Sequence, residues 1–117
     1  MVYRISQPDD WDQARQTGCF ASADLAAEGF IHASELGQVL ETARRYYPNS
    51  PGAVLLEIDP AALAAAGVRL EREWAAGRQA WFPHVFAPVP LAAVRRWWPF
   101  PVAPDGRAAL PADLTPP

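Results

Sequence analysis

The segment GFIHAS, residues 29–34, carries one of the two histidines of the chain, and WFPH, residues 81–84, carries the other. Both histidines, His32 and His84, lie within short apolar runs that favour β-strands. A histidine in such a run is either a core imidazole bound to a backbone carbonyl or a member of a shared site. Under either interpretation, we expect the two segments to be strands in the core of the domain.

Strands and helices are predicted on both sides of GFIHAS. Val2–Ser6 is rich in β-branched and aromatic residues, which predicts a strand. Pro8 suits the first turn of a helix that Gly18 would end. Ser34 is expected to be the N-cap of a further helix. The apolar residues of that helix recur at three- and four-residue spacing over residues 36–47.

The second half of the chain is predicted to supply the central strand. Residues 53–58, AVLLEI, form a continuous apolar run of strand length, which favours the central position in the sheet. Asp59 and Pro60 match the N-cap and first position of a short helix. Pro83 cannot donate a ladder hydrogen bond, so the strand over residues 81–86 is expected to be an edge strand or to carry a bulge.

The order of these elements favours an α+β domain with split, mostly antiparallel sheets and a few short helices. The helices are too few for a doubly wound parallel sheet. We expect one domain over residues 1–98. Residues 99–117 hold six of the 13 prolines and predict a proline-rich C-terminal tail, either extended over the domain or disordered. Residues 19–27 predict a loop or a single helical turn.

Composition excludes several classes of function. The formal net charge is −3, and all ten basic residues are arginine, so no lysine-dependent mechanism is available. The acidic balance and the lack of a basic stripe argue against nucleic-acid binding. No apolar run approaches the roughly 18 residues of a membrane span, and the first residues do not resemble a signal peptide. The single cysteine, Cys19, fits a reducing compartment, so we expect a cytoplasmic protein.

Four polar residues remain as candidates for chemistry, because the chain has no glycine-rich nucleotide motif, zinc-protease motif or cysteine pair. His32 and Ser34 are two apart, and in a strand such residues point to the same face, where a ligand would meet an imidazole and a hydroxyl. Ser34 is also explained by a helix cap, and Glu71 by solvation in its strand. A zinc site from His32, His84 and Glu71 has no support in the spacing, and no metal is expected.

Taken together, these stretches resemble the bacterial "domain of unknown function 952" family. The resemblance covers roughly residues 2–95, nearly everything except the tail. The matching stretches are VYRI at 2–5, W-x-x-A-x-x-x-G at 11–18, EGFIHAS at 28–34, VLLEID at 54–59, VRLE at 68–71 and FPHVFAPV at 82–89. The resemblance implies the ADP-ribosyltransferase fold, in which a cleft lies between two small split sheets.

The resemblance also implies a ligand. The IHAS segment is similar to the V-H-x-S segment of RNA 2′-phosphotransferases, which use NAD, so His32 and Ser34 would face a nucleotide. Those enzymes place a histidine on the first strand to hold a ribose of NAD. This chain has no histidine there, and Tyr3 or Arg4 stands near that position. NAD is the cofactor that the resemblance implies.

Our leading hypothesis is a small cytoplasmic domain whose cleft binds a nucleotide or another small anionic ligand. His32, Ser34, Glu71 and His84 would line this cleft. If the domain is an enzyme, the resemblance implies transfer at an NAD ribose. In that reaction Glu71 would stabilise the developing positive charge, and His84 would be the second catalytic group. The sequence leaves open whether it catalyses a reaction, and it leaves the oligomeric state open.

The alternative is a non-catalytic module that keeps only the fold and binds a partner protein or a metabolite. Its hydrophobic anchors would be four tryptophans, Trp74, Trp81, Trp97 and Trp98. The position of the two histidines separates the hypotheses. A shared site requires His32 and His84 to open into one cleft, whereas imidazoles on opposite faces of a sheet would exclude it.

Overall fold

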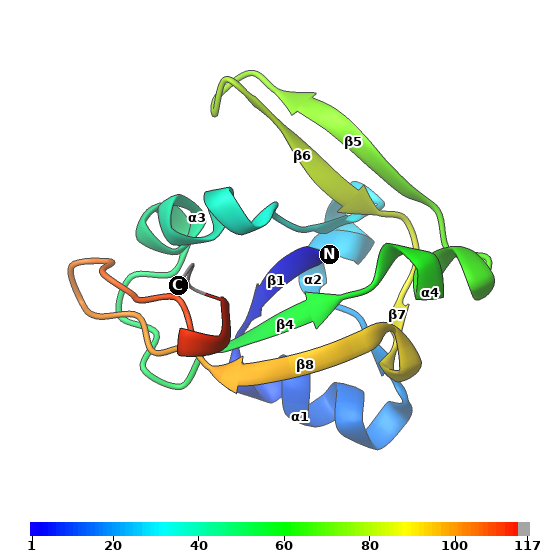
Figure 1. Ribbon diagram of the computed structural model, residues 1–117, viewed down its shortest axis with the longest axis horizontal. Coiled ribbons are helices and arrows are strands. Elements are labelled where there is room, and N and C mark those ends of the chain that lie inside the picture. The colour runs from blue at the N-terminus through cyan, green and yellow to red at the C-terminus, as the bar shows by residue number, and fades with distance from the viewer. Residues whose placement is uncertain (115–117) are drawn as a thin grey trace.

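The computed structural model describes residues 1–114, in which short strands alternate with short helices (Figure 1). Each strand pairing in this part of the chain is antiparallel, which confirms a mixed α+β class with mostly antiparallel sheets. The narrower assignment to the ADP-ribosyltransferase fold stays a prediction. The helices and strands are β1 (Val2–Ser6), α1 (Pro8–Thr17), β2 (Cys19–Phe20), α2 (Ala23–Glu28), β3 (Ile31–His32), α3 (Val39–Tyr46), β4 (Val54–Ile58), α4 (Pro60–Ala65), β5 (Leu70–Ala75), β6 (Ala80–Val85), β7 (Val89–Pro90) and β8 (Val94–Pro99).

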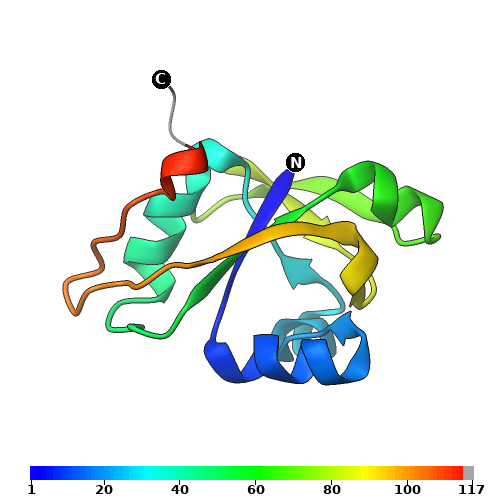
Figure 2. The same cartoon turned by 60° about the horizontal axis from the view of Figure 1, so that its bottom comes forward.

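The first sheet has the order β1–β4–β8, which confirms the prediction that residues 53–58 supply the central strand. Successive side chains of β4 point to opposite faces, and both faces are covered by helices (Figure 2). Leu56 packs in a core that includes Trp11 of α1, whereas Leu55 packs in a second core that includes Val39 of α3. Burial on both faces explains why the residues of this strand are apolar apart from Glu57, whose buried carboxylate is paired with Arg96.

The second sheet has the order β3–β6–β5, so β6 is its middle strand. The prediction of an edge strand or a bulge at Pro83 was therefore wrong. The carbonyl of Pro83 accepts a hydrogen bond from Ala33 N at 3.0 Å, so the backbone polar atoms of Pro83 face the β3 side. Regular pairing with β3 ends one residue earlier, at His32, and the β5 ladder keeps its register with Arg72 opposite Pro83.

A β-bridge joins the two three-stranded sheets. Tyr3 of β1 and Ser34 exchange two backbone hydrogen bonds, each 2.8 Å long. Because the bridge holds Ser34 in an extended backbone, the next helical turn begins one residue later. Glu35 is its N-cap and forms a capping box with Gln38, so the prediction that Ser34 is the cap was wrong. A 3₁₀ turn at Leu36–Gln38 then leads into α3.

Residues 19–27 contain more structure than the predicted loop or single turn. β2 pairs with β7, and α2 follows over six residues. Gly29 ends α2 in the left-handed conformation, with a φ of 88°, and donates its N–H to Leu25 O at 2.9 Å. This short helix places Asp24 and Glu28 beside His32 of β3.

The C-terminal segment closes one of the two cores. Phe100 and Val102 are each 1% exposed and pack in the core that includes α3. Val102 also bridges to Ser50. The part of the predicted tail at residues 115–117 lies outside the described residues. Within residues 1–114, no helix has the length and apolar character needed to cross a bilayer.

Candidate functional site

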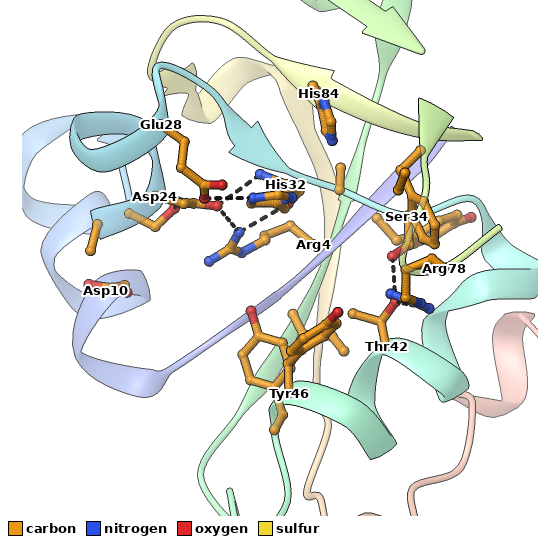
Figure 3. Close-up of a pocket in the computed structure, with 18 of the residues that line it drawn as sticks. Arg4, Asp10, Asp24, Glu28, His32, Ser34, Thr42, Tyr46, Arg78 and His84 are labelled. Atoms are coloured by element: carbon orange, nitrogen blue, oxygen red, sulfur yellow. Dashed lines mark hydrogen bonds and ion pairs between the residues drawn. The ribbon is translucent and has the colours of Figure 1, made fainter. Parts of the chain in front are cut away.

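A cavity of about 630 Å³ lies where the two sheets separate, bordered by α2, α3 and the β5–β6 hairpin (Figure 3). Its volume falls within the range of roughly 300–1,000 Å³ that is usual for small-molecule sites. The lining combines aromatic side chains with charged and hydroxyl groups. Its polar and titratable residues are Tyr3, Arg4, Asp10, Ser22, Asp24, Glu28, His32, Ser34, Thr42, Tyr46, Tyr47, Arg78 and His84.

His32 and His84 both line this cavity. β3 and β6 place them directly opposite each other, so their side chains share one face of the sheet. Their ring centroids are 5.1 Å apart, and Phe30 stacks on the His84 ring with centroids 4.0 Å apart. The two imidazoles thus occupy one open site, which is the arrangement that a shared site requires.

Each imidazole is bound to a carboxylate. Nε2 of His32 lies 2.8 Å from Oε2 of Glu28, and Nδ1 of His84 lies 2.7 Å from Oε1 of Glu73. The two pairs differ in exposure. The side chain of His84 is 9% exposed, whereas that of His32 is 49% exposed.

Glu71 lies opposite His84 in the β5–β6 ladder, but its side chain does not line the cavity. Its carboxylate is half-exposed and lies 4.0 Å from Arg69. Glu73, two residues along β5 on the same face, contacts His84 diagonally instead. Sequence analysis missed Glu73. Strand alternation puts Glu71 and Glu73 on one face, but only the register shows which of them reaches the imidazole.

At one end of the cavity, Arg4 and Asp24 tie β1, α2 and β3 together. Nη1 of Arg4 lies 2.6 Å from Oδ2 of Asp24 and donates to the carbonyl of His32 at 3.0 Å. Asp24 also accepts from His32 N at 2.8 Å, from Leu25 N at 3.1 Å and from the Ser22 hydroxyl. Both charged side chains are nearly buried, at 11% and 13% exposed. The two charges at this end of the cavity are paired with each other, and among the described residues Nε of Arg4 is a buried donor without a hydrogen-bond partner.

The electrostatics of Asp24 follow from these contacts. Burial alone would raise the pKa of the Asp24 carboxyl. The Arg4 guanidinium and the hydrogen bonds from Ser22 and His32 N outweigh burial and hold this pKa below its ordinary value of 3.8. Asp24 is therefore a fixed negative charge that holds Arg4 in place.

Tyr3, predicted to bind a cofactor, has its hydroxyl committed to the protein. It donates to Oε2 of Glu57 at 2.9 Å. Burial, together with this hydrogen bond and the charge of Glu57, raises the pKa of Tyr3 to about 12. Burial also raises the pKa of Tyr47 in the cavity wall, with the charges of Asp24 and Asp10 adding to the rise and that of Arg4 opposing it.

At the other end of the cavity, Arg78 faces two hydroxyl groups. Its Nη2 donates to Oγ1 of Thr42 at 3.2 Å, and the Thr42 hydroxyl lies 3.2 Å from that of Ser34. The guanidinium also lies over the rings of Phe82, at 4.4 Å, and Tyr46, at 5.6 Å. No carboxylate in residues 1–114 forms an ion pair with Arg78. Sequence analysis gave no sign of this residue, since it lies in the turn between β5 and β6.

Residues 5–97 match the model of a family described as protein of unknown function, DUF952. The chain belongs to this family. It is similar to the crystal structure of protein CC0527 from Caulobacter crescentus, with 32% identity, 92% of each chain covered and a TM-score of 0.81. The solution NMR structure of CC0527 is also similar, with 32% identity, 91% of this chain and 89% of that chain covered, and a TM-score of 0.69. No curated protein matches the chain.

The span that matches the DUF952 family includes both imidazoles, Glu73 and Arg78, whereas Tyr3 and Arg4 precede it. Among residues 1–114, no group of three or more histidine, cysteine and acidic side chains is arranged to hold a metal ion. The cavity therefore offers three kinds of chemical group: a cation beside hydroxyls, two carboxylate-bound imidazoles, and aromatic walls.

Proposed function

We propose that this member of the DUF952 family binds a nucleotide or another small anionic ligand in the cavity. The observation that carries the proposal is the position of Arg78, a cation in the wall with no carboxylate partner among the described residues and with two hydroxyls beside it. A guanidinium donates two parallel hydrogen bonds to a phosphate or carboxylate group. The hydroxyls of Thr42 and Ser34 supply further donors at the same end.

The aromatic walls favour a ligand that also carries a planar ring. Tyr46 and Trp74 both line the cavity, and these residues are 62% and 49% exposed. Stacking of a base on an exposed aromatic ring contributes roughly 1–3 kcal/mol. Glu28 lies across the cavity from Arg78, near His32, and its carboxylate can accept from ligand hydroxyls (Figure 3). A nucleotide has all three features: an anion, a ring and hydroxyls.

The fit to NAD is weaker than the fit to a nucleotide in general. The resemblance to RNA 2′-phosphotransferases places Tyr3 or Arg4 where a ribose would be held. In this structure Tyr3 donates to Glu57, and Arg4 is bound to Asp24 and to the His32 carbonyl. The Tyr3 hydroxyl and Nη1 of Arg4 are used within the protein, and Nε of Arg4 is buried without a hydrogen-bond partner among residues 1–114. These side chains therefore do not fit the ribose-holding role. Our proposal is therefore binding, with no step through NAD.

A thermal-shift titration with AMP, 2′-AMP, ADP-ribose and NAD tests the proposal. A ligand that binds the folded state adds about 2.7 kcal/mol of stability at 100 times its dissociation constant. We expect at least one of the four to raise the melting temperature of the wild type and to lose this effect in Arg78→Gln. The matched control is Arg72→Gln, on the same hairpin but paired with Glu35 outside the cavity lining, which should keep the shift.

The absence of a shift with all four ligands would contradict the proposal, as would an equal shift in Arg78→Gln. The first of these outcomes would favour a second candidate function, docking of a partner protein on the hairpin. Trp74 and Trp81 lie opposite each other on β5 and β6, with their ring centroids 5.7 Å apart. Trp81 is 59% exposed and lies outside the cavity lining, so Trp81→Ala would affect docking and leave nucleotide binding unchanged.

A further inference from the structure

Two contacts fix the orientation of the His84 imidazole. Its Nδ1 lies 2.7 Å from Oε1 of Glu73 on the neighbouring strand. One face of the ring stacks on Phe30, with centroids 4.0 Å apart and an interplanar angle of 18°. With 9% of its side chain exposed, the ring has little freedom to turn. A ring held in this way presents the same nitrogen atom to the cavity at all times.

That atom is Nε2. An ionised carboxylate can only accept hydrogen bonds, so Nδ1 must carry the proton that is shared with Glu73. A neutral imidazole with its proton on Nδ1 has its lone pair on Nε2. Within residues 1–114, no group forms a hydrogen bond with Nε2 of His84. Figure 3 shows the ring pointing from β6 toward His32 and the cavity.

His32 is the natural comparison, because it is also bound to a carboxylate. There the contact runs from Nε2 to Glu28, and both side chains are about half-exposed, at 49% and 50%. Glu73 is nearly as exposed as Glu28, at 48%, so the two pairs differ in the imidazole and not in the carboxylate. The His84 ring is buried and stacked on Phe30, whereas the half-exposed His32 ring is held less firmly. Of the two imidazoles, His84 is therefore the one with a fixed ring, a fixed proton position and a lone pair available to a ligand.

We propose that His84 is a general base toward the ligand in this cavity and that Glu73 is its positioning residue. In the step, a hydroxyl or N–H group of the ligand gives its proton to Nε2 of His84, and the electron pair stays on the ligand atom. The ring becomes an imidazolium, whose new charge the Glu73 carboxylate stabilises without taking the proton. The proposal rests on the binding function above, and the ribose hydroxyls of a nucleotide are groups of the required class.

The proton position is tested on the ligand-free protein. Nitrogen-15 NMR of the imidazole rings reads the tautomer of each histidine, and the chain has only two. We expect His84 to be protonated on Nδ1 and His32 on Nε2. In Glu73→Ala, His84 should become a mixture of tautomers while the tautomer of His32 is unchanged. In Glu28→Ala, His32 should become a mixture while the tautomer of His84 is unchanged. Protonation of His84 on Nε2 in the wild type, or no change in Glu73→Ala, would overturn the proposal.

The reactivity of Nε2 is tested with p-nitrophenyl acetate, an activated ester. The Nε2 lone pair attacks the ester carbonyl, and p-nitrophenolate leaves with the electrons of the broken C–O bond. Water then hydrolyses the N-acetyl group on the ring, which releases acetate and a proton and restores the imidazole, so the rate reports whether the Nε2 lone pair is available. We expect His84→Ala to remove the protein-dependent rate and Glu73→Ala to lower it by about tenfold. The matched control is Glu71→Ala, two residues away on β5 and outside the cavity lining, which should leave the rate unchanged. Circular dichroism of each variant checks that it folds.

A wild-type rate equal to that of His84→Ala would overturn the proposal, and so would a loss in Glu71→Ala equal to that in Glu73→Ala. Neither this assay nor the tautomer measurement needs the natural ligand. If the nucleotides fail to bind while both results hold, the acid–base pair stands and the ligand class is wrong. If AMP binds but His84 is protonated on Nε2, the proposed binding function stands and the role of His84 as a general base is wrong.

Discussion

The two ends of the cavity each contain an arginine, and the protein uses them differently. Arg4 is nearly buried, lies 2.6 Å from Asp24 and donates to the carbonyl of His32. Arg78 lies in the wall without a carboxylate partner among residues 1–114, over two aromatic rings and beside the Thr42 hydroxyl. The same residue type thus holds the fold at one end and remains available to a ligand at the other.

Burial explains this difference. A charge taken out of water must be paired and hydrogen-bonded, or it costs several kcal/mol. Nη1 of Arg4 meets this condition through Asp24 and the His32 carbonyl, and Asp24 also accepts from backbone and hydroxyl donors. Arg78 is only partly buried in a hairpin turn, so water can solvate it until an anion replaces that water. Because the site is open to water, Arg78 avoids the desolvation cost that an unpaired charge would have in a closed core.

The largest change in stability is expected when the Arg4–Asp24 ion pair is broken. Asp24→Ala leaves the Arg4 guanidinium nearly buried without its carboxylate, which should lower the free energy of unfolding by about 3–5 kcal/mol. Urea denaturation measures this change. The control is Glu28→Ala, which breaks a half-exposed pair and should cost no more than about 1 kcal/mol. Equal costs for the two variants would show that the Arg4–Asp24 pair does not hold the fold.

A smaller effect is expected on acidification. The folded-state pKa of Asp24 lies below its ordinary value of 3.8, so the unfolded chain binds its proton first as the pH falls. The stability that Asp24 contributes is full above pH 3.8 and is lost as the pH falls through the folded-state pKa. Because Glu57 and Asp59 also have lowered pKa values, the test is the difference between two unfolding curves. Asp24→Asn should lose less stability on acidification than the wild type, and equal losses would contradict the account.

The smallest effect on stability is expected at the unpaired end. Arg78→Ala removes the contacts with Phe82 and Tyr46 and one hydrogen bond to Thr42, which should cost about 1 kcal/mol. The same urea measurement gives this value. A loss of stability as large as that in Asp24→Ala would mean that Arg78 supports the fold and is not available to a ligand.

The elements of this fold could be predicted from local patterns, but the composition of the site could not. The apolar run at 53–58 predicted the central strand, and Asp59 caps α4 as expected, accepting from Ala61 N at 2.9 Å. The failures at Ser34 and Pro83 have a tertiary cause. The bridge to β1 moved the helix start by one residue, and the early end of β3 made room for a proline in a middle strand.

The site itself depends on register and on long-range contact. Strand periodicity predicted that His32 faces a ligand, but only the β3–β6 register places it opposite His84. The same applies to the choice between Glu71 and Glu73 on β5. Arg78 belongs to a turn with no periodic signal, and it reaches Thr42, 36 residues away, only in the folded protein.

The most direct test of the central claim is the ratio of the affinities for AMP and adenosine, measured by calorimetry in the wild type and in Arg78→Gln. A charged hydrogen bond contributes about 1.5–3 kcal/mol, so the wild type should bind AMP about ten- to a hundredfold more tightly than adenosine. In Arg78→Gln the ratio should fall close to one, while Arg72→Gln should keep it. A wild type that binds AMP and adenosine equally well, or a ratio that survives in Arg78→Gln, would contradict the claim that this end of the cavity binds the anion.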